Sequence, residues 1–317
     1  MAELSDQLMA FTVLAYLVAM ICYAGEYAFG KRSHIGKAAT RQLVGAGAPV
    51  PPVAEQPVER AKLSRGEWSG RIAVAFTFLG LALHLGSTAT RGIAAERMPW
   101  GNMYEYILSA TLVGAVVWAG VLIRKPAVRH LGLFASLSLV VLLGAANLIA
   151  YTPVGPLVPA LNSYWFIVHV STIIVSSGIF LIGAVPATMF LIKNGYDEGK
   201  RTFPYTLGKR VSDAAGLERL TFRLHAFAFP LFTFGALIAG PLWAEASWGR
   251  YWGWDPKEVW AFISWIVYAA YLHARATPSV KRTVATWIAL LGFVTMLMNL
   301  FGVNLFFEGL HSYADAG

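Results

Sequence analysis

The chain has 317 residues, of which 57% are hydrophobic and only 13% are charged. This composition, together with a positive mean hydropathy, excludes an ordinary soluble domain and indicates a protein that crosses the membrane several times. The net charge of +8 would suggest a nucleic acid as the partner of a soluble protein, but in a membrane protein the position of each charge matters more than the sum. We therefore expect a lipid bilayer as a partner and no nucleic acid.

The start of the chain and its single cysteine limit two further properties. Glu3 and Asp6 stand where a signal peptide has basic residues, and the first apolar run is long enough to span, so we expect a membrane helix there and no cleavable signal peptide. Cys22 lies inside this run, which predicts no internal disulfide, no Cys-x-x-Cys pair and no zinc site. Any thiol chemistry near this protein must then be supplied by another molecule.

Eight segments are apolar over roughly the length that a membrane helix needs, about 20 residues. In chain order they are residues 8–30, 72–90, 104–123, 131–150, 165–192, 224–243, 257–273 and 283–306. The sequence therefore predicts an all-α integral membrane protein with about eight transmembrane helices. The first helix, within residues 1–30, is followed by residues 31–71, which are rich in Ala, Gly, Pro and scattered charge and predict a flexible cytoplasmic linker. The other seven helices would form one domain, residues 72–317.

Basic residues predict which side of the membrane each connection faces. They cluster in four connections, which are residues 31–71, 124–129, 193–223 and 275–282. Cytoplasmic loops carry an excess of Lys and Arg, so these four are expected inside, and the basic residues left outside are Arg91, Arg97, Arg250 and Lys257. With an even number of spans both termini are expected to be extracytoplasmic, as is the loop between the sixth and seventh helices.

This outer loop, residues 243–260, is the centre of a tryptophan cluster. Of the 11 Trp residues in the chain, the cluster contains Trp243, Trp248, Trp252, Trp254, Trp260 and Trp265. Tryptophan presents a broad, stiff apolar face with one N–H donor, which suits a large planar ligand such as porphyrin. The alternative is an aromatic belt at the membrane boundary, which explains one or two of these residues but fits the Gly-interrupted loop less well.

The end of the tryptophan loop has a local meaning of its own. Asp255 can cap the helix that follows, Pro256 suits its first position, and Glu258 stands where a capping box has a carboxylate. A structural role is therefore an alternative to ligand binding for Asp255.

Two histidines are expected at the same outer surface as the tryptophans. His169 lies about one turn into the fifth segment, and His311 follows the last segment. Two neutral imidazole nitrogens on opposite faces of a macrocycle are what axial coordination of a haem iron requires. For either histidine alone the alternative is a hydrogen bond to a loop, and it is their joint occurrence with the tryptophan cluster that favours haem.

His273 is expected near the inner boundary of the membrane. It lies roughly 27 Å along one helix from Asp255, at about 1.5 Å per residue, and so cannot serve the outer site. A second, deeper site would need His225 or a histidine of another chain opposite His273. His84 lies too close to the outer edge to share an iron with His273 easily. A structural role is the alternative for both His84 and His225.

Several of these segments resemble a known family. They are Trp248 to Glu258, Asn162 to His169, Tyr271 to His273 and Gly309 to Tyr313, with a weaker match at Pro99 to Glu105. From about residue 72 to its end, the chain resembles the tryptophan-rich WWD haem-handling proteins, and among them the CcsA (ResC) type of subunit of System II cytochrome c synthases. Residues 31–71 lie outside the resemblance.

The resemblance implies a plasma-membrane protein that acts with a ResB-like subunit. Such a complex receives haem b from the cytoplasmic side, passes it outward and joins its vinyl groups to the thiols of a Cys-x-x-Cys-His segment of apocytochrome c. By the same resemblance His169 and His311 would be the axial ligands of the outer haem. His273 would bind an inner haem, with the second ligand supplied by the ResB-like partner. The residues that would hold the outer ring are Trp248, Trp252, Trp254, Asp255 and Trp260.

Thioether formation depends on positioning, so no side-chain nucleophile is expected. Arg250, or else Arg97 or Arg91, is the candidate for pairing with a haem propionate, because guanidinium binds carboxylates bidentately; an arginine that faces lipid headgroups is the alternative. The rival functions are a haem transporter or chaperone without ligation activity, and a transporter that does not handle haem. Eight spans and a histidine on each side of the tryptophan loop favour the synthase.

Overall fold

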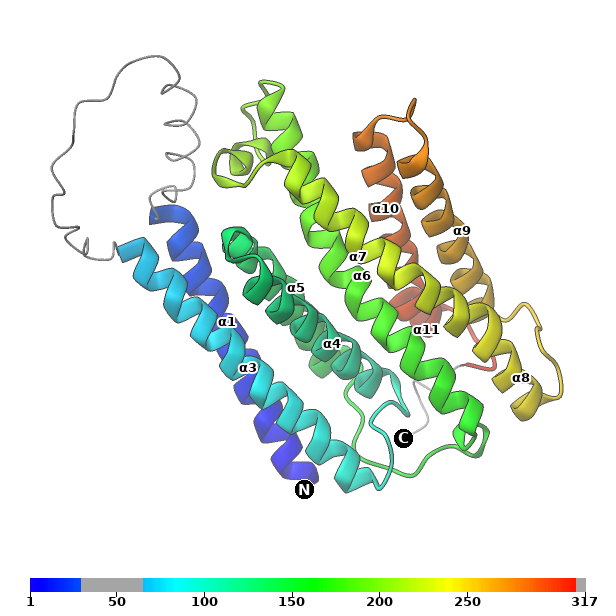
Figure 1. Ribbon diagram of the computed structural model, residues 1–317. Helices are drawn as coiled ribbons and strands as arrows, with labels where there is room; N and C mark the ends of the chain where they lie inside the picture. The colour runs from blue at the N-terminus through cyan, green and yellow to red at the C-terminus, as the bar shows by residue number, and fades with distance from the viewer. Residues whose placement is uncertain (30–64, 312–317) are drawn as a thin grey trace, which may run out of the picture.

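The computed structural model describes residues 1–29 and 65–311, and every regular element in these residues is helical. The helices are α1 (Ala2–Phe29), α3 (Arg65–Ala95), α4 (Met103–Arg124), α5 (Gly132–Ile149), α6 (Tyr164–Asp197), α7 (Ala214–Phe234), α8 (Gly240–Trp248), α9 (Pro256–Ala276), α10 (Arg282–Leu297) and α11 (Val303–Phe306). Short 3-10 turns are η1 (Pro126–Leu131), η2 (Pro159–Leu161) and η3 (Tyr205–Arg210), and π-helical turns are η4 (Gly235–Ala239) and η5 (Met298–Gly302). The predicted all-α fold is confirmed (Figure 1).

Within the described residues, seven helical segments are long and apolar enough to cross a membrane. They are α1, α3, α4, η1 with α5, α6, α7 through α8, and α10 through α11. The sequence predicted about eight, and the segment that differs is α9, because its charged first turn and its Trp and Tyr residues lower its hydropathy. α9 nevertheless packs along α10 in the same bundle.

The boundaries of the predicted linker and tryptophan loop differ from the structure. α3 already begins at Arg65, so residues 65–71 are helical and the predicted linker of residues 31–71 was too long at this end. The rest of that linker lies outside the described residues. α8 runs to Trp248 and α9 begins at Pro256, so only residues 249–255 of the predicted loop 243–260 are non-helical.

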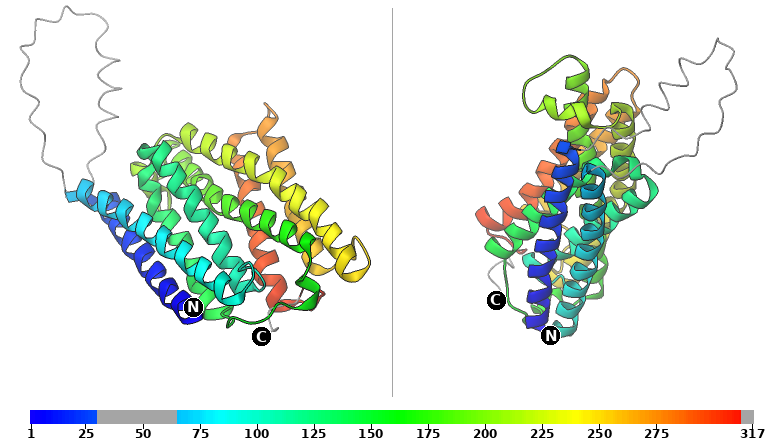
Figure 2. Two further views of the ribbon diagram at one scale, coloured as in Figure 1. Left: turned by 60° about the horizontal axis from the view of Figure 1, so that its bottom comes forward. Right: turned by 90° about the vertical axis from the view of Figure 1, so that its left-hand side faces the viewer.

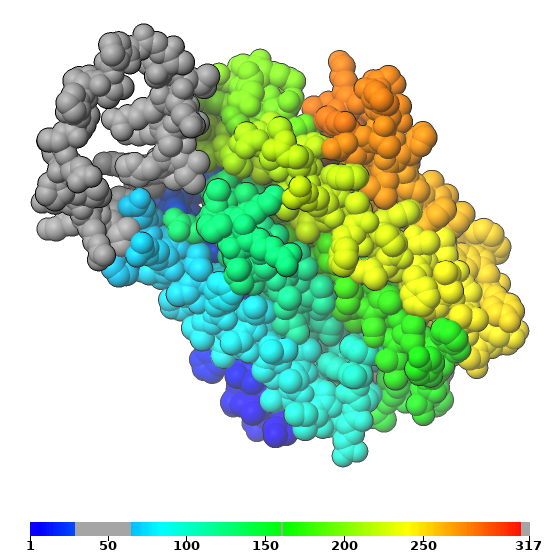
Figure 3. All heavy atoms as spheres, viewed as in Figure 1, coloured from blue at the N-terminus to red at the C-terminus, as the bar shows by residue number. Residues whose placement is uncertain are grey.

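Helices that follow one another in the chain are also neighbours in space. α1 packs along α3, α6 along α7, and α9 along α10. Figure 2 shows the helices side by side from two further directions, and in Figure 3 the colours change steadily across one face from α3 to α9. The first and last parts of the chain therefore form opposite sides of the bundle, with α4, α5 and α6 between them.

Side-chain contacts join the basic connections at one end of the bundle. These contacts pair Arg129 with Glu26, His130 with the backbone N–H of Ser212, and Arg275 with Glu218. At the opposite end the Tyr151 hydroxyl donates to Asp6 at 2.8 Å, which ties the end of α5 to the start of α1. Because the charge pattern predicts that this opposite end is extracytoplasmic, we call it the outer end.

Candidate functional site

A cavity of about 210 Å³ lies at the outer end, between α4, α6, α8, α9 and the α10–α11 segment. Most of its lining residues are apolar or aromatic, and they include Trp100, Phe166, His169, Trp243, Trp252 and His311. Both π-helical turns contribute to its wall, η4 through Ala236 and η5 through Asn299 and Leu300. Single π-helical turns inside α-helices are frequent at functional sites, so the cavity is the candidate site.

Trp243 is the common neighbour of the two predicted outer histidines. Its side chain is only 2% exposed, and the His169 ring stacks on it with a centroid distance of 5.6 Å and an interplanar angle of 16°. The His311 ring meets the same indole edge-on at 5.3 Å. The ring centroids of His169 and His311 can therefore lie no farther apart than the sum of these two distances. The structure brings the two residues together although they lie far apart in the sequence.

The position of His169 depends on the π-helical turn η4. Its Nδ1 atom lies 2.8 Å from the carbonyl oxygen of Gly235, the first residue of η4. A carbonyl oxygen only accepts, so Nδ1 carries the proton and Nε2 keeps its lone pair for a ligand. Gly240 makes room for the ring, because a Cβ atom there would lie 3.1 Å from His169 Nδ1.

His311 is oriented in the same way by Asp255. Its Nδ1 atom donates to Asp255 Oδ1 at 2.9 Å, so Nε2 again keeps its lone pair. The predicted capping box of Asp255 and Glu258 is confirmed, and Asp255 Oδ2 also accepts the backbone N–H of Leu310 at 2.7 Å. A histidine whose second nitrogen donates to a carboxylate is the usual arrangement at metal sites. Asp255 thus joins the start of α9 to the residues that follow α11.

The surroundings of Asp255 keep it ionised. Burial raises the pKa of its carboxyl group, but the hydrogen bonds from His311 and from the backbone N–H groups of Lys257 and Leu310 outweigh burial. The net result is a pKa below the ordinary value of an aspartate, since these donors favour the charged form. The carboxylate can therefore accept from His311 at neutral pH.

The tryptophans of the predicted cluster do not all face the cavity. Trp252 lines it, and Trp248 packs against Trp243 and His311 with centroid distances of 4.8 and 4.9 Å. Trp254 is 66% exposed and has a φ of +58°, a region that bulky residues rarely adopt. Trp260 lies in the second turn of α9 and is not among the cavity-lining residues.

Arg250 bends back over its own loop. A Cβ atom at Gly253 would lie 2.4 Å from the Arg250 guanidinium carbon, and Arg250 is not among the residues that line the cavity. Trp243 contacts both histidines but was not among the predicted site residues. It belongs to the tryptophan cluster, but nothing in the sequence distinguished it from the others.

The other histidines of the described residues do not line the cavity. His273 is exposed at the inner end of α9, as its predicted depth requires. His225 is buried and its ring lies 5.1 Å from that of Tyr271, which faces the bundle core while His273 faces away from it. His84 is buried too, with Nε2 at 3.1 Å from the carbonyl oxygen of Leu108.

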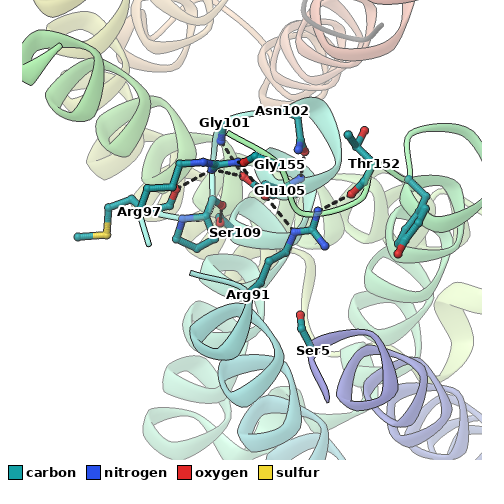
Figure 4. A network of polar contacts seen from close by, with 12 residues as sticks. Ser5, Arg91, Arg97, Gly101, Asn102, Glu105, Ser109, Thr152 and Gly155 are labelled. Carbon is teal, nitrogen blue, oxygen red and sulfur yellow. Dashed lines mark hydrogen bonds and ion pairs between the residues drawn. The ribbon is translucent and has the colours of Figure 1, made fainter. Parts of the chain in front are cut away.

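Two arginines that were candidates for binding propionate share one buried glutamate. Arg91 Nε lies 3.0 Å from Glu105 Oε1, and Arg97 Nη1 lies 2.7 Å from Glu105 Oε2. Glu105 is fully buried and also accepts the backbone N–H of Gly101 at 2.8 Å. Figure 4 shows both guanidinium groups converging on this carboxylate. The network fixes residues 97–102, which supply Trp100 to the cavity wall.

The fold and the paired histidines define a multi-pass membrane protein with an aromatic, histidine-lined site at one end. A family model described as cytochrome C assembly protein matches residues 100–311. Relatives described as cytochrome c biogenesis protein CcsA are 36% identical in Guillardia theta, covering 71% of this chain and 79% of the relative, and 32% identical in Gloeobacter violaceus, covering 72% and 82%. The chain therefore belongs to the cytochrome c assembly protein family and resembles its CcsA-type members.

A solved structure described as cytochrome c heme lyase CcmF has the same fold. Its TM-score is 0.60 at 18% sequence identity, and the match covers 95% of this chain but 46% of that chain. This chain therefore spans about half the length of that protein. At this identity the likeness establishes the fold alone. All residues that line the cavity lie within residues 100–311, the part of the chain that matches the family model.

Proposed function

We propose that this protein handles haem b as a substrate in cytochrome c maturation. It holds the haem at the outer end between His169 and His311 and presents the two vinyl groups to the thiols of a Cys-x-x-Cys-His segment of apocytochrome c. The observation that carries this proposal is the pair of histidines around Trp243. Each histidine has its Nδ1 engaged by the protein, which leaves Nε2 for the iron.

The donor set and the walls of the cavity fit a haem, but the cavity must widen to hold one. Neutral imidazoles suit the iron, and apolar and aromatic walls suit the ring. The volume of about 210 Å³ is below the range of about 300–1,000 Å³ found for small-molecule sites. The non-helical residues 249–255 and 307–311 border the cavity through Trp252 and His311, and we propose that they move outward when the haem enters.

The ligation chemistry needs positioning by this chain. In each of the two additions a thiol S–H bond and the π bond of a vinyl group break, while an S–C bond and a C–H bond form, so no net oxidant or reductant is consumed. The proton and the sulfur both come from the substrate thiol. The protein therefore has to hold ring and peptide in register, and the histidine of the substrate motif then replaces one of the two imidazoles.

Tryptophans of the outer loop contact the haem ring or the incoming peptide; they are Trp248, Trp252, Trp254 and Trp260. The protein lies in the plasma membrane, crosses it several times and has its active side outside the cytoplasm. At the inner end, a ResB-like subunit supplies the ligand opposite His273. A contact between α9 and this partner is supported by the exposed residues Ile266, Ala270 and His273, because their spacing places them on one face of the helix.

Replacement of the two outer histidines tests the proposal. His169→Gly and His311→Gly, each co-expressed with a ResB-like partner and an apocytochrome c, should lose most of the covalent haem product and of the haem retained after purification. External imidazole should restore part of both, because it can occupy the space that glycine leaves. His130→Gly, at the inner end, is the control for loss of a histidine and should retain haem.

The same experiment separates the rival functions. A wild-type protein that retains haem but gives no covalent product with partner and apocytochrome c would be a haem transporter or chaperone. A wild-type protein without a Soret band after haem-replete growth would not handle haem. Unchanged product in both glycine variants would remove His169 and His311 as ligands.

A further inference from the structure

One basic side chain belongs to the cavity wall. Among the described Lys and Arg residues, Lys257 alone lines the cavity. Its amine donates to the carbonyl oxygen of Asn299 at 3.1 Å, and an ammonium group has three N–H donors. Two donors of Lys257 therefore remain for another acceptor.

The carboxylates beside Lys257 are engaged elsewhere. Asp255 accepts from His311 and from the backbone N–H groups of Lys257 and Leu310. Glu258 Oε2 accepts the backbone N–H of Gly253 at 2.8 Å and that of Asp255 at 3.0 Å. Among the described residues no carboxylate forms an ion pair with the Lys257 amine. A positive charge in a largely apolar cavity costs free energy unless it is paired.

A second donor in the same wall lacks an acceptor. The indole N–H of Trp252 is buried and has no hydrogen-bond partner among the described residues, and an indole nitrogen can only donate. Because Trp252 and Lys257 both line the cavity, the wall has one cationic and one neutral donor available to a ligand. A carboxylate is the group that satisfies both, since it only accepts and carries the opposite charge.

We propose that Lys257 and Trp252 bind a carboxylate of the ligand, and, resting on the proposed function, that this carboxylate is a haem propionate. Lys257 lies two residues beyond Asp255, which holds His311, so the start of α9 positions both the iron ligand and the propionate ligand. In protohaem the vinyl groups lie on the part of the ring away from the propionates. Lys257 is thus a positioning residue that determines which edge of the ring faces the substrate thiols.

The arginines are less suited to this role. Arg91 and Arg97 are both held by Glu105, and Arg250 lies over Gly253 instead of in the cavity wall. From the charge pattern alone, Lys257 was predicted only to lie on the extracytoplasmic side. Its position in the cavity wall supports a role in binding the ligand.

Haem with free or esterified propionates tests the proposal on the purified full-length protein. Soret titrations give the Kd for protohaem and for its dimethyl ester, which keeps the iron and the vinyl groups but has no carboxylate. The wild type should bind the free acid about tenfold or more tightly, because charge-assisted hydrogen bonds to a carboxylate are lost in the ester. Lys257→Met should bring the ratio of the two Kd values close to one, and Lys257→Arg should keep most of it.

Matched variants exclude other causes. Lys281→Met removes an exposed lysine at the start of α10 and should keep the wild-type ratio. Trp252→Phe removes the N–H and keeps an aromatic ring, so the ratio should fall partway; this variant also carries the test if Lys257→Met does not fold. Arg250→Met should keep the ratio.

Two results overturn the inference. A wild-type ratio near one does so without any variant, and so does a ratio that Arg250→Met abolishes while Lys257→Met leaves it intact. If the wild type binds neither haem, the proposed function itself fails. That outcome differs from tight binding of both haems, which contradicts only the role of Lys257.

Discussion

Two groups of buried charges at the outer end of the bundle are satisfied in different ways. In the network of Arg91, Arg97 and Glu105, the fully buried Glu105 carboxylate binds both guanidinium groups. At the start of α9, beside the cavity, Asp255 is engaged by His311 and backbone N–H groups, and no carboxylate of the described residues pairs with the Lys257 amine. A charge that the protein neutralises itself fixes a loop, whereas a charge without a partner is available to a ligand.

Removal of the Glu105 charge should give the largest effect on stability. Glu105→Gln keeps the shape of the side chain but removes the carboxylate that both arginines share, and it leaves Arg91 with only the longer contact to Asp6 at 3.7 Å. Removing one partner of a buried ion pair is expected to cost about 3–5 kcal/mol. Thermal unfolding of the purified protein in detergent measures the loss. Glu198→Gln, at an exposed pair with Lys200, should change stability by less than about 1 kcal/mol. Equal melting temperatures for Glu105→Gln and the wild type would contradict a stabilising role of the pairs that Glu105 forms with Arg91 and Arg97.

Removal of the Asp255 charge should affect the ligand more than the fold. Asp255→Asn can still cap α9 but holds His311 without a charge, so haem affinity should fall by about 10–100-fold, as for other partners of metal ligands. Soret titration measures this change. The matched control is Asp213→Asn at the cap of α7, which lies at the inner end and should leave affinity unchanged. If the two variants behave alike, Asp255 acts only as a cap.

Acid should weaken the contact between Asp255 and His311. The pKa of Asp255 is lower in the folded protein than its ordinary value of about 3.9. A group with a lowered folded-state pKa contributes stability that is fully present above the unfolded pKa and is lost as the pH falls through the folded pKa. The wild type should therefore keep this contribution at pH 5–7 and lose it below about pH 4. Unfolding measured against pH should show a smaller acid loss in Asp255→Asn, and parallel curves would contradict the assignment.

Local signals in the sequence predicted much of the fold. The apolar segments and the capping box around Asp255 depend on residues close in the chain. Seven of the eight predicted membrane segments are confirmed as helices apolar enough to cross a membrane, and so is the capping box. α9 did not fit the expected pattern, because its polar and aromatic residues serve the bundle interior and the cavity. The start of α3 at Arg65 was missed, because polar residues can extend a helix beyond its apolar part.

The site was only partly predictable because its contacts join distant residues. The parity of the membrane segments indicated that His169 and His311 lie at the same end. Nothing local indicated that Trp243 stacks on His169, or that Asp255 orients His311. The exposure of Trp254 was equally hidden, because a non-helical loop has no period from which the direction of a side chain follows.

The π-helical turns η4 and η5 determine the rotational phase of the helices beyond them. An α-helix advances by about 100° per residue, and a π-helical turn accommodates one extra residue relative to that repeat. Trp243 follows η4 and Asn304 follows η5, and both line the cavity. A single-residue deletion in either turn would preserve a continuous helix yet rotate these side chains by more than a quarter of a circle. The direction in which these side chains face the cavity thus depends on one extra residue in each π-helical turn. A hydropathy pattern does not reveal such an extra residue.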